Sequence, residues 1–553
     1  MALQDQKAPA EQKSKVASFP PPVGGWNTRD ALPAMAPTDA VIAQNVICQP
    51  WQVATRLGST SWATGAQYGI NTLMPYNAGA STAHKIYAAV ATNAGATTAA
   101  IYDISSGGAL GTPAVTGLIN SWFQWVNFGT QAGTFLVAVN GADSMQTFNG
   151  TSWTATATLV AAGPGPGVTG SGPYSLAMSS IIGIGAYQNT LYFVPTNALG
   201  FFYQSAQSIF GTVSYVNLSA LATRGGFLQA VATWTVDGGA GPQDYLVFIT
   251  SEGEFIVYQG ASFATAFGTA GAMALVGVYY IARPLGRRCW IKYGGDCLVL
   301  TELGLFPLSR SLQAATIDRT TALTDKIQPT FVQLATLTQA NNWQGWQIEL
   351  CQYGQFLIIS VPTMPNMQQL VMQLQSKGWS NWNGWSANCF LYTDGVLYYA
   401  DAAQVYIAYS GTSDLQLAGS SYVPSNIQST VLAAFTELKM QGQQKHVKLI
   451  RPYLTSTGSL TSYTVGSAVD YNQYLINTST QSGVSYTGTV GIWDVGIWDT
   501  ALWGTSAGVQ SKQWQTVAQF PCFSFAPYWQ FNQRSGQIAL AAYDVLFVPG
   551  GVL

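Results

Sequence analysis

Residues 244–260 read DYLVFITSEGEFIVYQG, and residues 294–309 read GGDCLVLTELGLFPLS. Each stretch holds two apolar runs that are joined by a short turn containing glutamate and glycine. A short apolar run bounded by turn residues is typical of a buried strand, and two such runs around a tight turn indicate an antiparallel hairpin. The segment from residue 231 to residue 308 therefore predicts two adjacent pairs of strands.

The same layout recurs on both sides of this segment. Apolar runs at 72–76, 85–91 and 99–104 form one group, and another contains the Asn-Gly pairs Asn140–Gly141 and Asn149–Gly150. Asn-Gly is a strong signal for a hairpin turn. Further groups begin near residues 181, 346 and 375. About seven units of roughly 50 residues each predict a β-propeller of about seven blades, within a range of six to eight.

The remainder of the chain divides around this propeller. Residues 309–335 have mixed helical spacing, which predicts a short helix or an insertion between blades. The pattern of apolar and polar residues changes after residue 418, where we expect a β-sandwich-like domain. We predict an all-β protein with the following parts: a flexible N-terminal arm (1–22), an N-terminal segment that packs on the body or platform (23–68), the β-propeller (69–418) and a C-terminal β-sandwich-like platform domain (419–553).

The composition is poor in charge. Of the 553 residues 8% are charged and 48% are hydrophobic, and the net charge is −2, whereas an ordinary domain has roughly 25% charged residues. An uncharged polar surface suits a protein that packs against other subunits, because charge is depleted at the centres of interfaces. With no basic stripe in the sequence, tight binding of nucleic acid through phosphates is disfavoured.

The N-terminus lacks the apolar core of a secretory signal, and no apolar run is long enough to cross a bilayer. We therefore expect assembly in a cytosol and no stable membrane insertion. The sequence contains no pair of cysteines with the spacing of a metal site, so we expect buried thiols and no metal or cofactor. The six cysteines are Cys48, Cys289, Cys297, Cys351, Cys389 and Cys522.

Catalytic groups are scarce. The two histidines, His84 and His446, lie in no context typical of a catalytic triad. A glycosidase would need two carboxyl groups in one cleft, and the acidic candidates all lie in or beside turns, where carboxylates ordinarily bind backbone N–H groups. These candidates are Asp237, Asp244, Glu252, Glu254, Asp296 and Glu302. We expect no enzyme and assign no catalytic, cofactor-binding or metal-binding residue.

Two clusters remain as candidates for binding. Arg283, Arg287 and Arg288 form the densest basic spot of the expected propeller. They could contact a DNA backbone or a neighbouring subunit, or they could lie in a solvated loop between blades and form internal salt bridges. Four tryptophans lie close together near the C-terminus and could form a sugar-binding platform, although core or interface packing is the commoner use. They are Trp493, Trp498, Trp503 and Trp514.

The N-terminal segment GGWNTRDALPAMAPTDAVIAQNVICQPWQVATRLGS resembles the opening of tail nozzle or hub proteins of short-tailed bacteriophages, the tail tubular protein B-like or DNA-stabilisation family. Residues 224–260 and the end of the chain also resemble this family. The matching positions are dispersed and form no catalytic motif. In the N-terminal segment they are Gly24, Gly25, Asn27, Thr28, Arg29, Asp39, Ala40, Asn45, Arg56 and Gly58.

This resemblance implies a structural protein of the virion tail, assembled in the host cytoplasm as a ring, with a homo-hexamer expected. The ring would attach below adaptor (head-to-tail connector) proteins, contact tail fibres or spikes, retain the packaged double-stranded DNA and form the channel for its ejection. An alternative is a receptor- or polysaccharide-binding β-propeller at the tail tip, and a third hypothesis is a tail-borne glycosidase.

Overall fold

The computed structural model forms two compact units. Unit 1 contains Met1–Ser59, Val371–Trp382 and Ser410–Leu553, and unit 2 contains Thr60–Leu370 and Asn383–Tyr409. The residues that the structure describes are 13–79, 83–166, 174–204, 208–237, 242–265, 268–311, 319–363, 367–418, 421–458, 462–482, 509–511, 513–517, 521–534 and 536–552.

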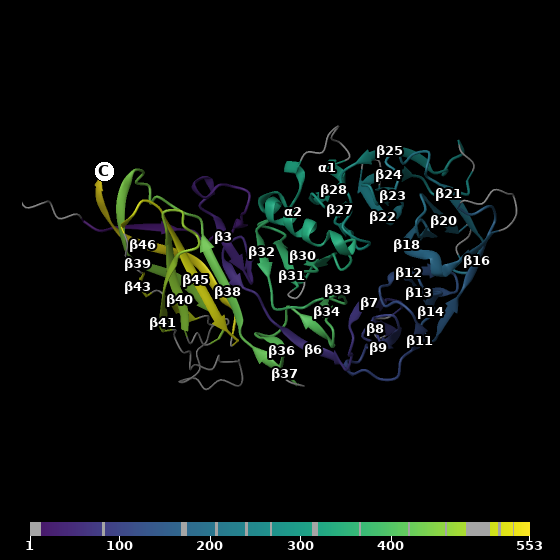
Figure 1. The fold of residues 1–553 in the computed structure, drawn as a ribbon, viewed down its shortest axis with the longest axis horizontal. Helices are drawn as coiled ribbons and strands as arrows, with labels where there is room; N and C mark the ends of the chain where they lie inside the picture. The colour runs from purple at the N-terminus through teal and green to yellow at the C-terminus, as the bar shows by residue number, and fades with distance from the viewer. Residues whose placement is uncertain are drawn as a thin grey trace, which may run out of the picture. The chain divides into compact units, whose positions relative to one another are not determined.

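Unit 2 is a β-propeller, and six of its sheets are self-contained blades (Figure 1). The first blade contains β6 (Ser59–Thr64), β10 (Gly108–Ala109), β33 (Cys389–Thr393), β34 (Val396–Ala400) and β35 (Gln404–Ala408). The second contains β7 (Ile70–Tyr76), β8 (Lys85–Ala91), β9 (Ala99–Asp103) and β11 (Val115–Leu118). The third contains β12 (Gln124–Thr130), β13 (Gly133–Val139), β14 (Met145–Phe148) and β15 (Trp153–Thr156).

The other three blades follow in chain order. The fourth contains β16 (Thr158–Ala161), β17 (Tyr174–Ala177), β18 (Ile181–Tyr187), β19 (Thr190–Pro195), β20 (Gly200–Gln204) and β21 (Val213–Asn217). The fifth contains β22 (Leu228–Asp237), β23 (Pro242–Thr250), β24 (Glu254–Gln259) and β25 (Ala274–Tyr280). The sixth contains β26 (Trp290–Tyr293), β27 (Asp296–Thr301) and β28 (Gly304–Pro307). The fifth and sixth sheets confirm both hairpins that the opening stretch predicts.

One strand of each blade lies innermost and contacts the innermost strands of its neighbours. The ring of contacts runs β7, β12, β18, β22, β26, β29, β33 and back to β7. The hairpin of β29 (Gln347–Cys351) and β30 (Phe356–Val361) therefore occupies the place between the sixth blade and the first. With six self-contained blades and this hairpin, the β-propeller lies within the predicted range.

The core of unit 2 lies between neighbouring blades. Tyr192 and Phe201 of the fourth blade share a cluster with Leu246 and Phe248 of the fifth, and the Phe201 and Phe248 rings stack at 4.0 Å. Comparable clusters join the other neighbours from the first blade to the fourth. A blade that buries both faces needs apolar residues at successive positions, and for this reason the strands appear in the sequence as continuous apolar runs.

The ring closes through strands that are far apart in the sequence. β6, near the start of unit 2, lies beside β35, near its end. Short helices fill the connection from the sixth blade to β29, as predicted for residues 309–335, of which residues 312–318 lie outside the described part. They are α1 (Leu308–Ser311), η4 (Arg319–Thr321), η5 (Asp325–Ile327), α2 (Gln328–Leu337) and η6 (Gln339–Asn341). A further turn, η3 (Met178–Ser180), precedes β18.

Two sheets of unit 1 pack around an apolar core. Trp529 of one sheet lies against Tyr543 of the other, with ring centroids 4.9 Å apart. The first sheet contains β1 (Lys15–Phe19), β4 (Val46–Cys48), β5 (Val53–Thr55), β39 (Gln443–Ser456), β42 (Val509–Ser511), β43 (Gln515–Thr516), β44 (Pro521–Cys522) and β46 (Ile538–Val552). The strands of the second that belong to unit 1 are β2 (Gly25–Trp26), β3 (Asp39–Gln44), β32 (Trp379–Trp382), β38 (Ile427–Ala433), β40 (Ser462–Val469), β41 (Ile476–Ser482) and β45 (Phe525–Gln533).

Three smaller elements complete the list. η1 is Leu32–Ala34, the hairpin of β36 (Asp414–Ala418) and β37 (Ser421–Ser425) belongs to unit 1, and β31 (Gln368–Gln373) spans the residues where the two units meet in the sequence.

The N-terminal arm differs from its prediction. Residues 15–19 form β1, which pairs antiparallel with β46, and Phe19 stacks on Tyr543 with ring centroids 5.3 Å apart. The prediction of a flexible arm over 1–22 is therefore wrong for these residues, because a partner strand from the other end of the chain supplies hydrogen bonds that a polar composition does not reveal. Residues 1–12 lie outside the described part.

The boundaries of the two units also differ from the predicted domain boundaries, because each unit contains segments that are separated in the sequence. The propeller unit runs from Thr60 to Tyr409 and omits Val371–Trp382, in place of the predicted 69–418. Met1–Ser59 belongs to the same compact unit as the C-terminal strands. The separate C-terminal domain at 419–553 stays a prediction. The strands of this segment share an apolar core with the N-terminal segment.

Candidate functional site

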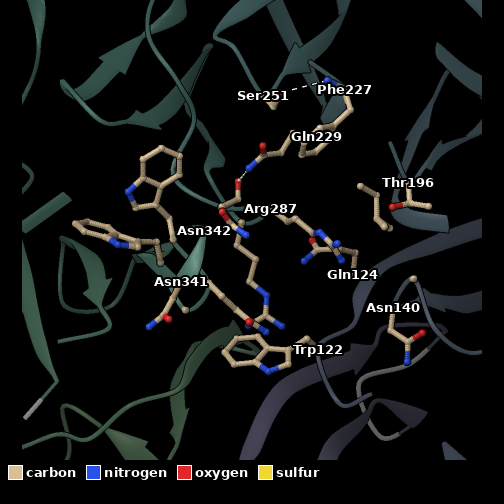
Figure 2. Close-up of a pocket in the computed structure, with 18 of the residues that line it drawn as sticks. Trp122, Gln124, Asn140, Thr196, Phe227, Gln229, Ser251, Arg287, Asn341 and Asn342 are labelled. Carbon is tan, nitrogen blue, oxygen red and sulfur yellow. Dashed lines mark hydrogen bonds between the residues drawn. The ribbon is translucent and has the colours of Figure 1, made fainter. Parts of the chain in front are cut away.

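A pocket of about 650 Å³ lies within unit 2 (Figure 2). Its lining comes from the connections that lead into innermost strands and from turns between the second and third strands of blades. Asn120, Trp122 and Gln124 lead into or begin β12, and Gly286 and Arg287 precede β26. The pocket is of the size at which proteins bind small ligands.

Two turns at the rim have their shape set by side-chain hydrogen bonds. The side-chain Oδ1 of Asn140 accepts from the backbone N–H groups of Ala142 and Asp143 at 3.0 and 2.8 Å. Asp143 in turn accepts from the N–H groups of Ile119 and Asn120. The Asn140–Gly141 pair thus lies in a hairpin connection, as predicted, and the same bonds hold one edge of the pocket.

The three arginines of the predicted basic cluster all line this pocket, but they have different surroundings. The Arg288 guanidinium donates to the Asn71 carbonyl oxygen at 3.1 Å, to Thr72 Oγ1 at 2.7 Å and to the Phe123 carbonyl oxygen at 3.2 Å. It also lies over the Trp122 ring, 5.3 Å from the centroid. Burial lowers the pKa of Arg288. Arg288 therefore ties the sixth blade to the second and third.

Arg283 forms an ion pair with Glu252, with Nε 3.3 Å from Oε2. Arg287 has no hydrogen-bond or ion-pair partner within the described part of the chain, and its side chain remains accessible in the pocket. Figure 2 shows Arg287 in the middle of the lining residues. Burial lowers its pKa, since surrounding protein disfavours the charged form. The cluster thus contains one structural arginine, one paired arginine and one that is unpaired.

Aromatic and amide side chains form most of the remaining lining. Trp346 is buried and donates its indole N–H to Thr338 Oγ1 at 2.9 Å, and Trp343 donates to the Ala335 carbonyl oxygen at 2.8 Å. Asn341 and Asn342 are exposed beside them. These residues belong to the segment QANNWQGW, in which amides alternate with tryptophans and for which no site was predicted. That local composition was the available signal.

The predicted acidic candidates do not gather. Of the described carboxyl groups among them, only that of Glu252 lines the pocket. Glu254 accepts from the N–H groups of Thr223 and Arg224, Asp296 binds the Ser309 N–H group, and Asp244 accepts from Gln188 and Thr235. Asp237 ends β22, and Glu302 follows β27. Glu254 and Asp296 thus bind backbone N–H groups, and the described lining of the pocket does not hold the pair of carboxyl groups that a glycosidase needs.

The remaining candidates lie elsewhere. His84 contacts Asp394 at 2.8 Å, and His446 lies in β39, so neither lines the pocket. Trp514 contacts Arg451, whose guanidinium lies 4.5 Å from the ring centroid. Trp493, Trp498 and Trp503 lie outside the described residues.

The cysteines are all buried, and no disulfide joins those in the described residues. Burial raises the pKa of Cys289 to about 12 and that of Cys389 to about 11, so these thiols stay protonated. Among the described residues, no group of three or more His, Cys, Asp or Glu side chains is placed to hold a metal ion. No helix of the described residues has the length and apolar character needed to cross a membrane.

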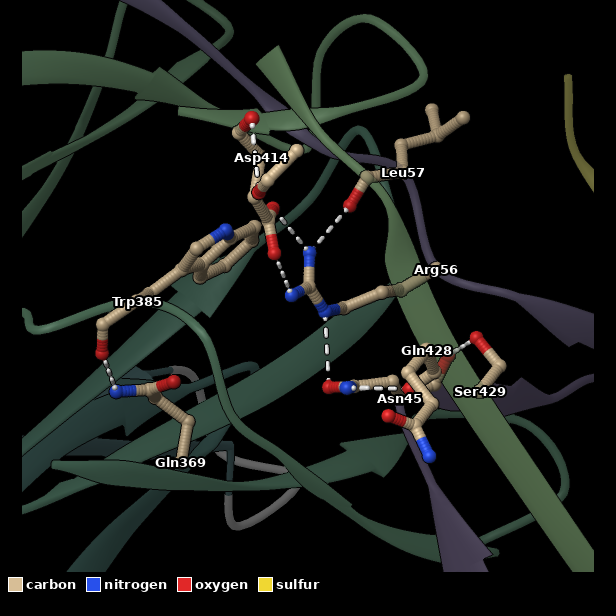
Figure 3. A network of polar contacts seen from close by, with 9 residues as sticks. Asn45, Arg56, Leu57, Gln369, Trp385, Asp414, Gln428 and Ser429 are labelled. Carbon is tan, nitrogen blue, oxygen red and sulfur yellow. Dashed lines mark hydrogen bonds and ion pairs between the residues drawn. The ribbon is translucent and has the colours of Figure 1, made fainter. Parts of the chain in front are cut away.

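A second polar site lies in unit 1 and involves residues of the N-terminal sequence pattern (Figure 3). The buried Arg56 forms an ion pair with Asp414, with Nη1 2.8 Å from Oδ1, and donates from Nε to Asn45 Oδ1 at 3.0 Å. Asn45 donates to the Gln428 carbonyl oxygen at 2.8 Å. Asn27 similarly donates to Asp39 Oδ2 at 2.7 Å. Asn27, Asp39, Asn45 and Arg56 therefore hold the N-terminal segment within unit 1.

The glycines of this pattern are required by close backbone contacts. Gly25 has a φ of +76°, and a Cβ atom there would lie 2.4 Å from the Trp379 backbone nitrogen. A Cβ atom on Gly58 would overlap the Ser413 backbone. Like the polar residues, these glycines serve the fold of unit 1.

Comparisons with known proteins identify no family. No protein-family model matches the sequence, and comparison with curated proteins gives no match. Solved structures to which the chain is similar include YCF48 bound to D1 peptide, at 11% identity and a TM-score of 0.33, covering 66% of this chain and 97% of that chain. Another is the β-propeller domain of Cps50 (Swd1) from Myceliophteria thermophila, at 9% identity and a TM-score of 0.35, covering 64% of this chain and 99% of that chain. At this level of identity the likeness concerns the fold alone.

Proposed function

We propose that this chain is a structural subunit of a short-tailed phage tail, the nozzle or hub ring below an adaptor ring. In this role it retains packaged DNA, forms the ejection channel and performs no enzymatic reaction. The proposal rests on the sequence pattern of residues 24–58, and its support from the structure is an exposed apolar edge in the propeller unit.

This edge is β25, the outermost strand of the fifth blade. Its sequence, ALVGVYY, contains no charged residue, and its exposed side chains include Leu275 (43%), Val276 (45%), Val278 (38%) and Tyr280 (39%). Monomeric proteins usually protect such edges with charges, proline or a covering element. Arg224 lies over the Tyr280 ring, 3.5 Å from the centroid, at one end of this strand. The exposed apolar residues Leu275, Val276 and Val278 nevertheless suit an interface. A second copy of the chain is the occupant that a ring requires.

The mechanism of such a ring is mechanical. Subunit contacts would bury the apolar edges, and loops of the assembled ring would narrow the channel and hold the DNA. Ejection would follow when contact with the host favours a second packing of these loops. The low charge of the chain, 8% of residues, suits a channel wall that does not retain the DNA backbone electrostatically.

Sedimentation of the purified chain, alone and mixed with an adaptor ring, tests the proposal. We expect a ring with the mass of six subunits, and a chain that stays monomeric under both conditions would overturn it. The double variant Val276→Lys/Val278→Lys should prevent assembly, because it places charges in the apolar edge. Val160→Lys, at an exposed valine of β16, serves as the control. If the double variant still forms rings, β25 is not part of the interface between subunits.

A second candidate function is polysaccharide or receptor binding at the tail tip. The observation that favours it is the pocket, whose amide and tryptophan lining is suited to hydroxyl groups and sugar faces. Titration of the chain with neutral and acidic oligosaccharides tests it, and absence of any saccharide binding would exclude it. This test does not depend on whether the chain assembles into a ring.

A further inference from the structure

We propose that the pocket of unit 2 binds a saccharide that carries a carboxylate, with Arg287 as the residue that recognises the acid. This inference rests on the second candidate function and adds to it the chemical class of the ligand. It follows from the distribution of charge in the pocket, from the uncharged polar lining and from the size of the pocket.

The charge distribution leaves one cation without a partner. The charged lining residues are Glu252, Arg283, Arg287 and Arg288. Glu252 pairs with Arg283, and Arg288 is held by Thr72 and two carbonyl oxygens. Arg287 therefore supplies positive charge that no carboxylate of the described residues balances. Such a site favours an anion, because a guanidinium without a carboxylate partner can form charge-assisted hydrogen bonds with a carboxylate.

The guanidinium is placed beside the rim and not in the core. A Cβ atom added at Gly141 would lie 3.7 Å from Arg287 Nη1, so the guanidinium lies next to the turn that Asn140 and Asp143 hold rigid. A planar guanidinium with free N–H groups can donate two parallel hydrogen bonds to a carboxylate. The turn therefore helps to define where the acid group of a ligand would sit.

The uncharged lining is suited to the rest of a sugar. Asn and Gln side chains make up the largest group of polar lining residues. An amide both donates and accepts hydrogen bonds, as a sugar hydroxyl does. Trp122 and Trp343 contribute partly exposed aromatic surface. A volume of about 650 Å³ accommodates a short oligosaccharide.

Nucleic acid fits these observations less well. A phosphate backbone is bound by several cations arranged along its path, whereas this pocket offers one unpaired arginine in a chain of net charge −2. The observations therefore favour one carboxylate among many hydroxyls over a run of phosphates.

Isothermal titration calorimetry of the full-length chain tests the proposal. The probes are a galacturonic acid trimer, a galactose trimer, inorganic phosphate and a short DNA duplex. We expect the acidic trimer to bind at least about tenfold more tightly than the neutral one, since hydrogen bonds from a guanidinium to a carboxylate are charge-assisted. Arg287→Gln should remove this preference, and Arg287→Lys should retain part of it. Arg310→Gln, at an exposed arginine outside the pocket, should retain all of it.

The outcomes separate the two levels of the proposal. Equal binding of both trimers would overturn the proposal that the ligand is acidic, but the proposal of saccharide binding would stand. Binding of neither trimer would overturn both. Tighter binding of phosphate or of the duplex would assign the pocket to phosphate groups and would also overturn the inference. An unchanged melting temperature of Arg287→Gln shows that any lost preference does not come from unfolding.

Discussion

Arg56 in unit 1 and Arg287 in unit 2 represent two uses of the same side chain. Arg56 is 2% exposed and bound to Asp414 and Asn45, so its guanidinium joins segments that are far apart in the sequence. Arg287 is accessible in a pocket, and no carboxylate of the described residues pairs with it. Both belong to patterns that the sequence singles out. The difference shows that an arginine in a pattern indicates a fold or a site only once its partners are known.

The largest effect is expected at Arg56. The change Arg56→Gln leaves the carboxylate of Asp414 buried without its ion pair and should lower the free energy of unfolding by about 3–5 kcal/mol. Urea denaturation measures the loss. Arg29→Gln is the control, because Arg29 pairs with Asp30 at a partly exposed position, where about 1 kcal/mol or less is expected. Equal losses in the two variants would contradict the structural role of Arg56.

The next largest effect is expected at Gly25. The change Gly25→Ala adds an unfavourable φ and a clash with the Trp379 backbone, and it should cost about 2–4 kcal/mol in total. Gly79→Ala separates the two causes, because Gly79 has a φ of +65° but no heavy atom within 4 Å of the added Cβ atom. That control should cost about 1 kcal/mol. A similar loss at both positions, measured by urea denaturation, would show that the close contact is unimportant.

Arg288 and Arg287 provide the same contrast between a structural and an unpartnered arginine within the pocket of unit 2. The change Arg288→Gln removes donors from Thr72 and from two carbonyl oxygens, so a loss of about 2–3 kcal/mol is expected. Arg287→Gln should change the free energy of unfolding by less than about 0.5 kcal/mol, because it breaks no hydrogen bond or ion pair with the described residues. Thermal melting of both variants provides the measurement. The reverse order of effects would place Arg287 in the structure and Arg288 in the site.

The last prediction is a dependence of stability on pH. Burial raises the pKa of Glu349 to about 8, with the Arg288 charge and hydrogen bonds opposing that rise. An unfolded chain releases this proton near the ordinary value of 4.5. The contribution of Glu349 to stability is therefore present below about pH 4.5 and is lost as the pH rises to about 8. Glu349→Gln should flatten the decline in melting temperature over this range, and an unchanged decline would assign it to other groups.

Local patterns in the sequence were sufficient to predict many elements. The hairpins at 245–250 with 254–259 and at 296–301 with 304–307 appear as β23–β24 and β27–β28. The runs 85–91 and 99–104 appear as β8 and β9. These predictions succeeded because a hairpin depends on residues adjacent in the chain, so turn chemistry and apolar runs determine it without distant partners.

Prediction was weaker for the candidate site. The sequence reveals the arginine cluster but not the different roles of its three members. Those roles depend on the partners Thr72, Phe123 and Glu252, which come from other blades. The segment QANNWQGW was missed, because its amides and tryptophans line a common pocket only once β29 has taken its place in the ring of innermost strands. The residues that line the pocket come from eight separate stretches of the chain, so no single local pattern reveals the whole pocket.

The sequence by itself determined the all-β class, the repeated hairpins and the range of blade number, because each follows from short apolar runs and their turns. Only the tertiary structure decided that β6 lies beside β35, that β1 pairs with β46 and that Arg287, alone of its cluster, has no partner among the described residues. The physical reason is the same in each case. Long-range pairing depends on which groups of distant segments come within hydrogen-bonding reach, and the linear order of residues does not specify this.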